Sequence, residues 1–327
     1  MEIAAIVTAF LVGYAMKHGG LCTYAAALQI VSDGRFERLA AFLSAAAWTV
    51  LVVVPMAWIW PGNLSLSATH HQWQMAVSGG MLLGLGAYLN RGCVFGTFVQ
   101  LVGGNLAYVA TLAGMVAGSV IGKLYLSGLA PVKSELGLAA QPGLGAGVWV
   151  LMAAIFIVIT TLGFSRPVSG KRPAFRSFDS VLVALALGAG GGWLFATIRG
   201  WDFASVLTQF TYEALDISPV GPAWLAIGCT LSMVAGGVAA AMLRNRFAWK
   251  RPVPRIFFGC LAGGMLMGVG AILVPGGNDG LLLSGIPAFA PHALVAYVAM
   301  LVVMVLLLVL VPNQQGYSIG LWKGRNP

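Results

Sequence analysis

The sequence contains very little charge. Only 8% of its 327 residues are Asp, Glu, Lys or Arg, while 59% are hydrophobic and the mean hydropathy is +0.89. A typical soluble domain has about 25% charged residues, so this composition excludes a water-soluble globule. Many windows of about 20 apolar residues predict membrane-spanning helices instead. The predicted fold class is therefore an all-α polytopic membrane protein embedded in a lipid bilayer.

Cysteine is also scarce, and several functional motifs are missing. The four cysteines form no C-x-x-C pair and no zinc spacing, so neither a disulfide framework nor a metal site is expected. No G-x-x-x-x-G-K-[ST] loop occurs, which argues against a nucleotide-driven pump. We expect no cofactor and no enzyme activity. The net charge of +9 does not predict a nucleic-acid partner, because Lys and Arg lie in short loops between apolar runs.

An internal repeat is the most prominent feature that the sequence does contain. Ser78–Gly96 returns 184 positions later as Ala262–Gly280, with ten identical residues and no gap. Such a repeat predicts two structurally related halves. In each copy, a glycine-rich apolar helix ends at a break and a short apolar piece follows. The copies differ at the break, where Cys93 in the first corresponds to Gly277 in the second.

Apolar runs predict nine full membrane spans, with four shorter pieces between them. The expected spans are 3–16, 39–60, 73–89, 105–122, 147–164, 180–197, 222–243, 256–274 and 293–311. The shorter pieces are 19–31, 94–102, 200–212 and 281–289. A helix needs about 20 residues to cross a bilayer, so we expect the shorter pieces to be re-entrant half-helices that dip into the membrane and return.

The distribution of Lys and Arg predicts how the spans are oriented. The loops 166–176 and 244–255 hold four and five basic residues and should be cytoplasmic, as should the C-terminal tail. The helix 73–89 and its copy 256–274 then enter the membrane from opposite sides. We therefore expect one membrane domain with two inverted, pseudo-symmetric repeats. Its parts are a first repeat (1–122), a linking span and cytoplasmic loop (123–177), a second repeat (178–312) and a tail (313–327).

Inverted repeats with broken helices are typical of secondary transporters, whose ligand sites lie where the breaks meet. Cys22 and Cys93 each follow a cation and a glycine at the start of a half-helix, a setting that favours anions and reactive thiols. The alternative is that both are small packing residues. Cys229 and Cys260 lie inside continuous spans and are expected to pack. The candidate substrate-binding residues are Cys22, Arg91, Gly92, Cys93, Gly276, Gly277 and Asn278.

The remaining charges near the breaks have simpler interpretations. Arg91 could equally anchor the cytoplasmic end of its span. Asp202 is expected to pair with Arg199, and Asp279 to cap a helix together with Asn278. The predicted spans contain no buried acidic residue that would indicate a proton relay, so the sequence does not identify a driving ion.

These motifs resemble those of the YeeE/YedE sulfur-transport family. The resemblance covers nearly the whole chain and rests on three motifs. The first is Gly19-Gly20-Leu21-Cys22, and the second runs from Gly79-Gly80 to Gly92-Cys93. The third comprises 263–268, 276–278 and Leu283-Ser284-Gly285. It implies an inner-membrane protein that takes up thiosulfate past cysteines lining a central constriction. Cys22 and Cys93 match the family pattern, whereas the third family cysteine, in a G-G-C-N pattern, should stand at Gly277.

Three functions are compatible with this pattern. The first is import of a small inorganic sulfur anion, with thiosulfate as the leading candidate. The second is a membrane sulfurtransferase component in which Cys93 accepts sulfur and would carry a persulfide after turnover. The third is a non-transporting membrane subunit of a sulfur-handling system, which would show no flux in proteoliposomes. Family analogy alone implies a soluble sulfurtransferase as a partner.

Overall fold

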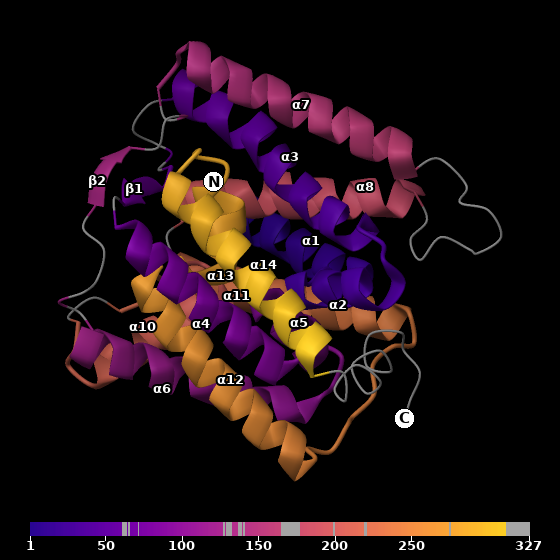
Figure 1. The fold of residues 1–327 in the computed structure, drawn as a ribbon, viewed down its shortest axis with the longest axis vertical. Helices are drawn as coiled ribbons and strands as arrows, with labels where there is room; N and C mark the ends of the chain where they lie inside the picture. Colours follow the sequence, from indigo (N-terminus) through magenta and orange to yellow (C-terminus); the bar gives the residue numbers. More distant parts are fainter. Residues whose placement is uncertain are drawn as a thin grey trace.

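A computed structural model shows the chain as a bundle of helices (Figure 1). It describes residues 1–60, 64, 66–70, 72–126, 128, 133–136, 139, 141–164, 177–198, 200–218, 221–274 and 276–311. The long helices are α1 (Glu2–Gly19), α3 (Glu37–Ile59), α4 (Trp73–Asn90), α6 (Val109–Leu126), α7 (Leu144–Phe164), α11 (Trp224–Leu243), α12 (Pro254–Leu273) and α14 (Pro291–Leu310). Within the described residues, these account for eight helices that are long and apolar enough to cross a membrane, which confirms an all-α polytopic membrane protein.

The predicted span 180–197 is helical but not uniform. It consists of α8 (Ser177–Leu185), a π-helical stretch η4 (Ala186–Gly191) and α9 (Gly192–Thr197). Its apolar part, Val181–Thr197, is shorter than the eight long spans. The π-helical stretch contains Gly188, where an added Cβ would overlap the backbone carbonyl of Ala45 in α3. Close packing against α3 thus accompanies the local change of helix type.

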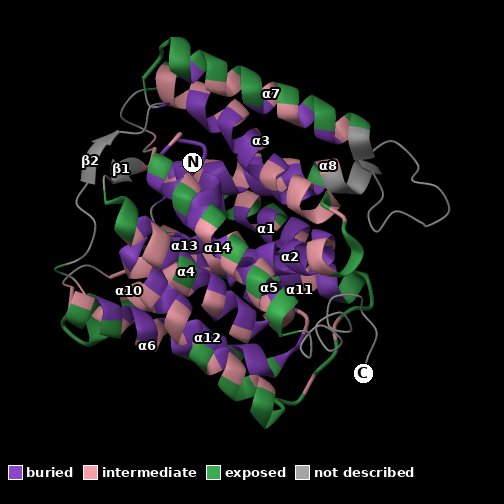
Figure 2. Cartoon of the chain, viewed as in Figure 1, coloured by how far each residue is buried: buried purple, intermediate pink, exposed green. Residues whose placement is uncertain are grey.

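Short helices occur at all four places where half-helices are predicted. They are α2 (Thr23–Asp33), α5 (Val94–Leu101), α10 (Phe203–Ala214), and α13 (Gly277–Gly280), which continues as the π-helical η5 (Leu281–Gly285). A 3₁₀ turn, η1 (Leu106–Tyr108), precedes α6, so this helix begins four residues later than predicted. Figure 2 shows mostly buried residues around α5 and α13, whereas α7 exposes one face at the edge of the bundle.

Two loops pair in a small β-ribbon that the sequence does not predict. Strand β1 (Ala68–His70) lies antiparallel to β2 (Lys133–Leu136). The first strand lies between α3 and α4, and the second between α6 and α7. The pairing therefore brings these two loops to the same end of the bundle. The basic loop 166–176 and the tail, on which part of the predicted orientation rests, lie outside the described residues.

Glycines allow the two helices that carry the sequence repeat, α4 and α12, to pack in equivalent ways. Gly80 of α4 lies against the carbonyl of Ala296 in α14, and its repeat equivalent Gly264 of α12 lies against the carbonyl of Thr111 in α6. In both places an added Cβ would overlap the partner backbone. Small residues at such crossings let two membrane helices approach closely. The α4–α14 and α12–α6 contacts are thus counterparts of each other.

Helices α4 and α12, the two copies of the repeat, also cross each other (Figure 1). An added Cβ at Gly79 would lie 3.1 Å from the carbonyl oxygen of Gly270, and one at Gly86 would lie 2.6 Å from that of Gly263. The order of contacts along one helix is the reverse of the order along the other. The two equivalent helices therefore run antiparallel, which is the relation that inverted repeats require.

We expect Gly80→Ala and Gly264→Ala each to destabilise the protein by about 1–3 kcal/mol, because the new methyl group must force two helix backbones apart. Thermal unfolding of the detergent-solubilised protein would measure the change. Gly147→Ala in α7 is the matched control, since its added Cβ meets nothing within 4 Å. Equal melting temperatures for all three variants and the natural protein would contradict this packing.

Candidate functional site

The starts of α2 and α5 meet in the interior of the bundle at two cysteines. Cys22 and Cys93 are the N-cap residues of these helices, and both have extended backbone conformations. Their Sγ atoms lie 3.3 Å apart, and both side chains are buried. The backbone N–H of Thr23 donates to Cys93 Sγ at 3.3 Å, and that of Cys93 donates to Cys22 Sγ at 3.4 Å. Each half-helix is therefore capped partly by the thiol of the other.

This arrangement suits an anion that carries a soft sulfur atom. A thiol is a weak donor and a polarisable acceptor. The first N–H groups of a helix leave a partial positive charge at its start, and here two such starts face each other. Tyr297 of α14 lies beside Thr23 and both thiols. The structure thus brings together Cys22 and Cys93, which are 71 residues apart.

Asn90 holds the first break in place, a role that the sequence did not reveal. Its Nδ2 donates to the Gly92 carbonyl at 2.6 Å and to Thr97 Oγ1 at 2.9 Å, and its Oδ1 accepts from Thr111 Oγ1 at 2.6 Å. The side chain is fully buried. One amide therefore joins the end of α4, the body of α5 and the start of α6. The repeat copy has Val274 at this position, and valine cannot make the corresponding hydrogen bonds at the second break.

Arg91 and Gly92 form the C-terminal end of α4. Arg91 has a left-handed backbone (φ 57°), and the N–H of Gly92 bonds to the Ala87 carbonyl at 3.0 Å, as in a glycine-type helix end. The Arg91 side chain is 9% exposed, and its charge lies within electrostatic range of Tyr108 and Cys260. The buried position of Arg91 is compatible with a role inside the protein, and its part in substrate binding stays a prediction.

The second break places Gly276, Gly277 and Asn278 at the start of α13. Gly276 and Gly277 both have left-handed backbones, with φ values of 96° and 56°. A Cβ added at Gly277 would lie 3.4 Å from Asp279 Oδ1 and 3.6 Å from the Ala271 Cβ, so the position has room for a side chain. Asn278 is 1% exposed, and neither polar atom of its side chain has a hydrogen-bond partner among the described residues.

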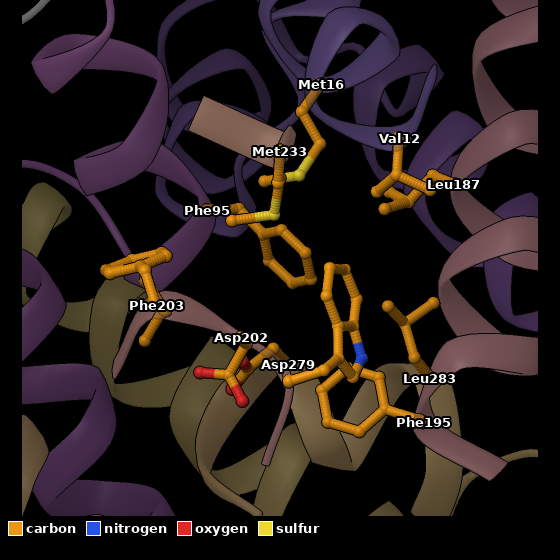
Figure 3. Close-up of a pocket in the computed structure, with 12 residues that line it drawn as sticks. Val12, Met16, Phe95, Leu187, Phe195, Asp202, Phe203, Met233, Asp279 and Leu283 are labelled. Atoms are coloured by element: carbon orange, nitrogen blue, oxygen red, sulfur yellow. The ribbon is translucent and has the colours of Figure 1, made fainter. Parts of the chain in front are cut away.

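Two acidic residues at the starts of α10 and α13 also come together, which the sequence analysis missed. Asp202 caps α10, and its Oδ1 accepts from the N–H groups of Ala204 and Ser205 at 3.1 and 2.9 Å. The Asp279 carboxyl lies beside that of Asp202, and both line the same cavity (Figure 3). The expected partner Arg199 lies outside the described residues. The cap expected of Asp279 is wrong, because the N-cap of α13 is Gly276 and no side chain caps this helix.

Asp202 and Asp279 line a small cavity next to the thiol pair. Figure 3 shows the two carboxyl groups side by side among aromatic, methionine and aliphatic side chains. Val94, which directly follows Cys93, lines the same cavity. The glycine–tryptophan–aspartate sequence before α10 signals an N-cap. Only the fold could show that this cap meets a residue 77 positions away. Within the described residues, no three His, Cys, Asp or Glu side chains gather as a metal site.

Comparison with known proteins agrees with this architecture. Residues 18–306 match the family model described as sulphur transport. The chain belongs to this family. Over 320 residues it is also 25% identical to the thiosulfate transporter TsuA of Spirochaeta thermophila, in an alignment that covers 87% of this chain and 91% of that protein.

Replacing Asn90 with Ala should lower the free energy of unfolding by about 1–3 kcal/mol, because it leaves buried partners of the amide unsatisfied. Thermal unfolding in detergent would measure this loss. Gln74→Ala, which removes an exposed amide from the same helix, is the control and should have little effect. If the two variants unfolded at the same temperature, the hydrogen bonds of the Asn90 amide would not stabilise the break.

Proposed function

We propose that this protein imports a small sulfur-containing anion, with thiosulfate as the first candidate, through a constriction formed by Cys22 and Cys93. The observation that carries the proposal is the buried contact between these thiols at the facing starts of two half-helices. Membership of the sulphur transport family and similarity to a thiosulfate transporter support it.

The chemistry of the pair favours thiosulfate over sulfate. The terminal sulfur of thiosulfate is a soft acceptor that a polarisable thiol can contact, whereas sulfate offers only hard oxygens. Thiol hydrogen bonds are weak, so a bound ion can leave again, as conduction requires. The backbone N–H groups at the helix starts add a positive potential that does not depend on any charged side chain.

Passage also requires the two thiols to separate. At 3.3 Å the sulfur atoms are in contact, and no anion can lie between them. The contact links two short helices rather than two full spans. Movement of α2 relative to α5 would therefore open the constriction, and it would break the hydrogen bonds that Thr23 and Cys93 make to the opposite sulfur.

The proposed setting is the bacterial inner membrane, with a cytoplasmic C-terminus and two complete inverted repeats. The antiparallel packing of α4 and α12 supports the inversion. Inverted halves place the breaks of both repeats near the bilayer midplane, where transporters of this design bind their ligands. We further propose that a soluble sulfurtransferase receives the imported sulfur, and that transport itself involves no catalysis by this chain.

Uptake of labelled thiosulfate into proteoliposomes would test the proposal. We expect Cys93→Ala to reduce the initial rate at least about tenfold, the effect of losing roughly 1.4 kcal/mol of transition-state stabilisation. Cys229→Ala, which removes a buried thiol inside the long helix α11, is the matched control and should transport normally. Absence of uptake by the folded natural protein would refute thiosulfate import. Equal uptake by all three proteins would refute the role of the thiol pair.

Gly277→Cys should raise thiosulfate uptake, because it adds a thiol at the third position of the family pattern. The left-handed backbone at Gly277 makes any side chain costly there, by about 1–2 kcal/mol of stability. Gly277→Ala has the same backbone strain without the thiol and is the control. Faster uptake by the cysteine variant than by the alanine variant would assign the effect to sulfur. Equal rates would show that this position does not contact the ion.

A further inference from the structure

The Asp202–Asp279 pair is the one buried acidic contact in the described part of the chain, and the thiol mechanism does not use it. Asp202 is 5% exposed and Asp279 is 8% exposed. Two ionised carboxylates side by side among apolar groups repel each other and can only accept hydrogen bonds, so a proton on one of them stabilises the pair. Both bonds of the α10 cap use Oδ1 of Asp202, which leaves Oδ2 unused by the cap. The pair is therefore built to hold at least one proton.

Among the described residues that line the cavity, none carries a positive charge that could replace this proton. The other side chains lining the cavity are apolar or aromatic and come from α1, α5, η4, α9, α11, η5 and the start of α10; they include Met16, Phe95, Leu187, Phe195, Met233 and Leu283. Among the described residues, three titratable groups lie next to these on the packed helices. Cys93 bonds to Cys22, Lys17 donates to the Val99 carbonyl at 2.8 Å, and Cys229 lies one turn before Met233. No described Lys or Arg forms an ion pair with either carboxyl.

A buried hydrogen-bond donor belongs to one of the side chains that line the cavity. Trp201, which is 2% exposed, lines the cavity, and its indole N–H has no hydrogen-bond partner among the described residues. Asn278, next to Asp279, has a buried side-chain amide that likewise has no hydrogen-bond partner among the described residues. Buried donors normally have partners, because an unpaired one costs free energy. Donors beside a protonated acid pair fit the oxygen atoms of an anion.

We propose that Asp202 and Asp279 form a proton-binding gate on the path of the anion, so that import of the anion is coupled to import of protons. This inference rests on the proposed transport function. When the pair holds its proton, it is less negative and can donate an O–H to the anion. When the pair is fully ionised, it repels the anion. The anion therefore advances from the thiols into the cavity only after the pair has been protonated.

Coupling of this kind addresses the energetics of import. An anion that enters a cell with a negative interior moves against the membrane potential. In the proposed cycle, a proton from outside binds a carboxylate oxygen and forms an O–H bond. That bond breaks on the inner side, where the proton leaves as the anion leaves. No electron transfer and no other covalent change is involved.

Accumulation in proteoliposomes would test the coupling. With the membrane potential held at zero by potassium and valinomycin, an acidic exterior should drive labelled thiosulfate inwards. One proton per anion predicts an accumulation ratio of about tenfold for each pH unit of gradient. Asp279→Asn should abolish this accumulation while labelled ion still equilibrates. Asp202→Asn should do the same, because asparagine preserves the helix cap.

Asp216→Asn is the matched control for both substitutions. Asp216 is exposed at the other end of α10 and has a left-handed backbone, which asparagine tolerates. This variant should accumulate thiosulfate like the natural protein. If the natural protein equilibrates thiosulfate but does not accumulate it, the gate is refuted and the transport function stands. Accumulation by Asp279→Asn equal to that of the natural protein would also refute the gate.

Infrared spectroscopy of the solubilised protein provides a readout that does not depend on transport. At neutral pH the natural protein should show the C=O stretching band of a protonated carboxylic acid, and Asp279→Asn should lose it, whereas Asp216→Asn should keep it. Absence of the band from the natural protein would overturn the proton-binding pair. If no thiosulfate flux were detected at all, the proposed function would fail, and the band alone would still decide whether the pair binds a proton.

Discussion

The structure depends on how the buried starts of its short helices satisfy their backbone N–H groups. A helix that begins inside the bundle cannot use water for its first donors, and each unpaired donor is costly in an apolar setting. At α2 and α5, the sulfur atoms of Cys22 and Cys93 accept from the opposite helix start. At α10, the Asp202 carboxylate accepts two N–H groups. Side chains from other elements or from the cap position therefore satisfy these donors inside the bundle.

Glycine determines how closely the helices carrying these breaks approach one another. At Gly80 and Gly264, and again where α4 crosses α12, backbone lies against backbone with no room for a methyl group. These contacts recur at corresponding positions of α4 and α12. The same kind of glycine packing therefore positions the break that follows each of these helices.

The breaks that follow the two repeated helices differ in their chemistry. The first has a thiol pair, braced by the buried amide of Asn90. The second has a carboxyl pair and two left-handed glycines, with no thiol at Gly277. Soft sulfur groups favour a sulfur anion, and acidic groups hold protons. In the proposed cycle, the thiols recognise the substrate and the carboxyl pair couples its movement to protons.

The sequence by itself determined the membrane class, the locations of the spans and short helices, and the relation between Ser78–Gly96 and its copy, because apolar length and repeat period are local properties of the chain. It also indicated Cys22 and Cys93 as a pair, since both follow a cation and a glycine. It did not show that Asn90 would bracket three elements or that Asp202 would meet Asp279, and it assigned both acids to local roles. Contacts between residues distant in sequence depend on helix packing, and only the tertiary structure decided them.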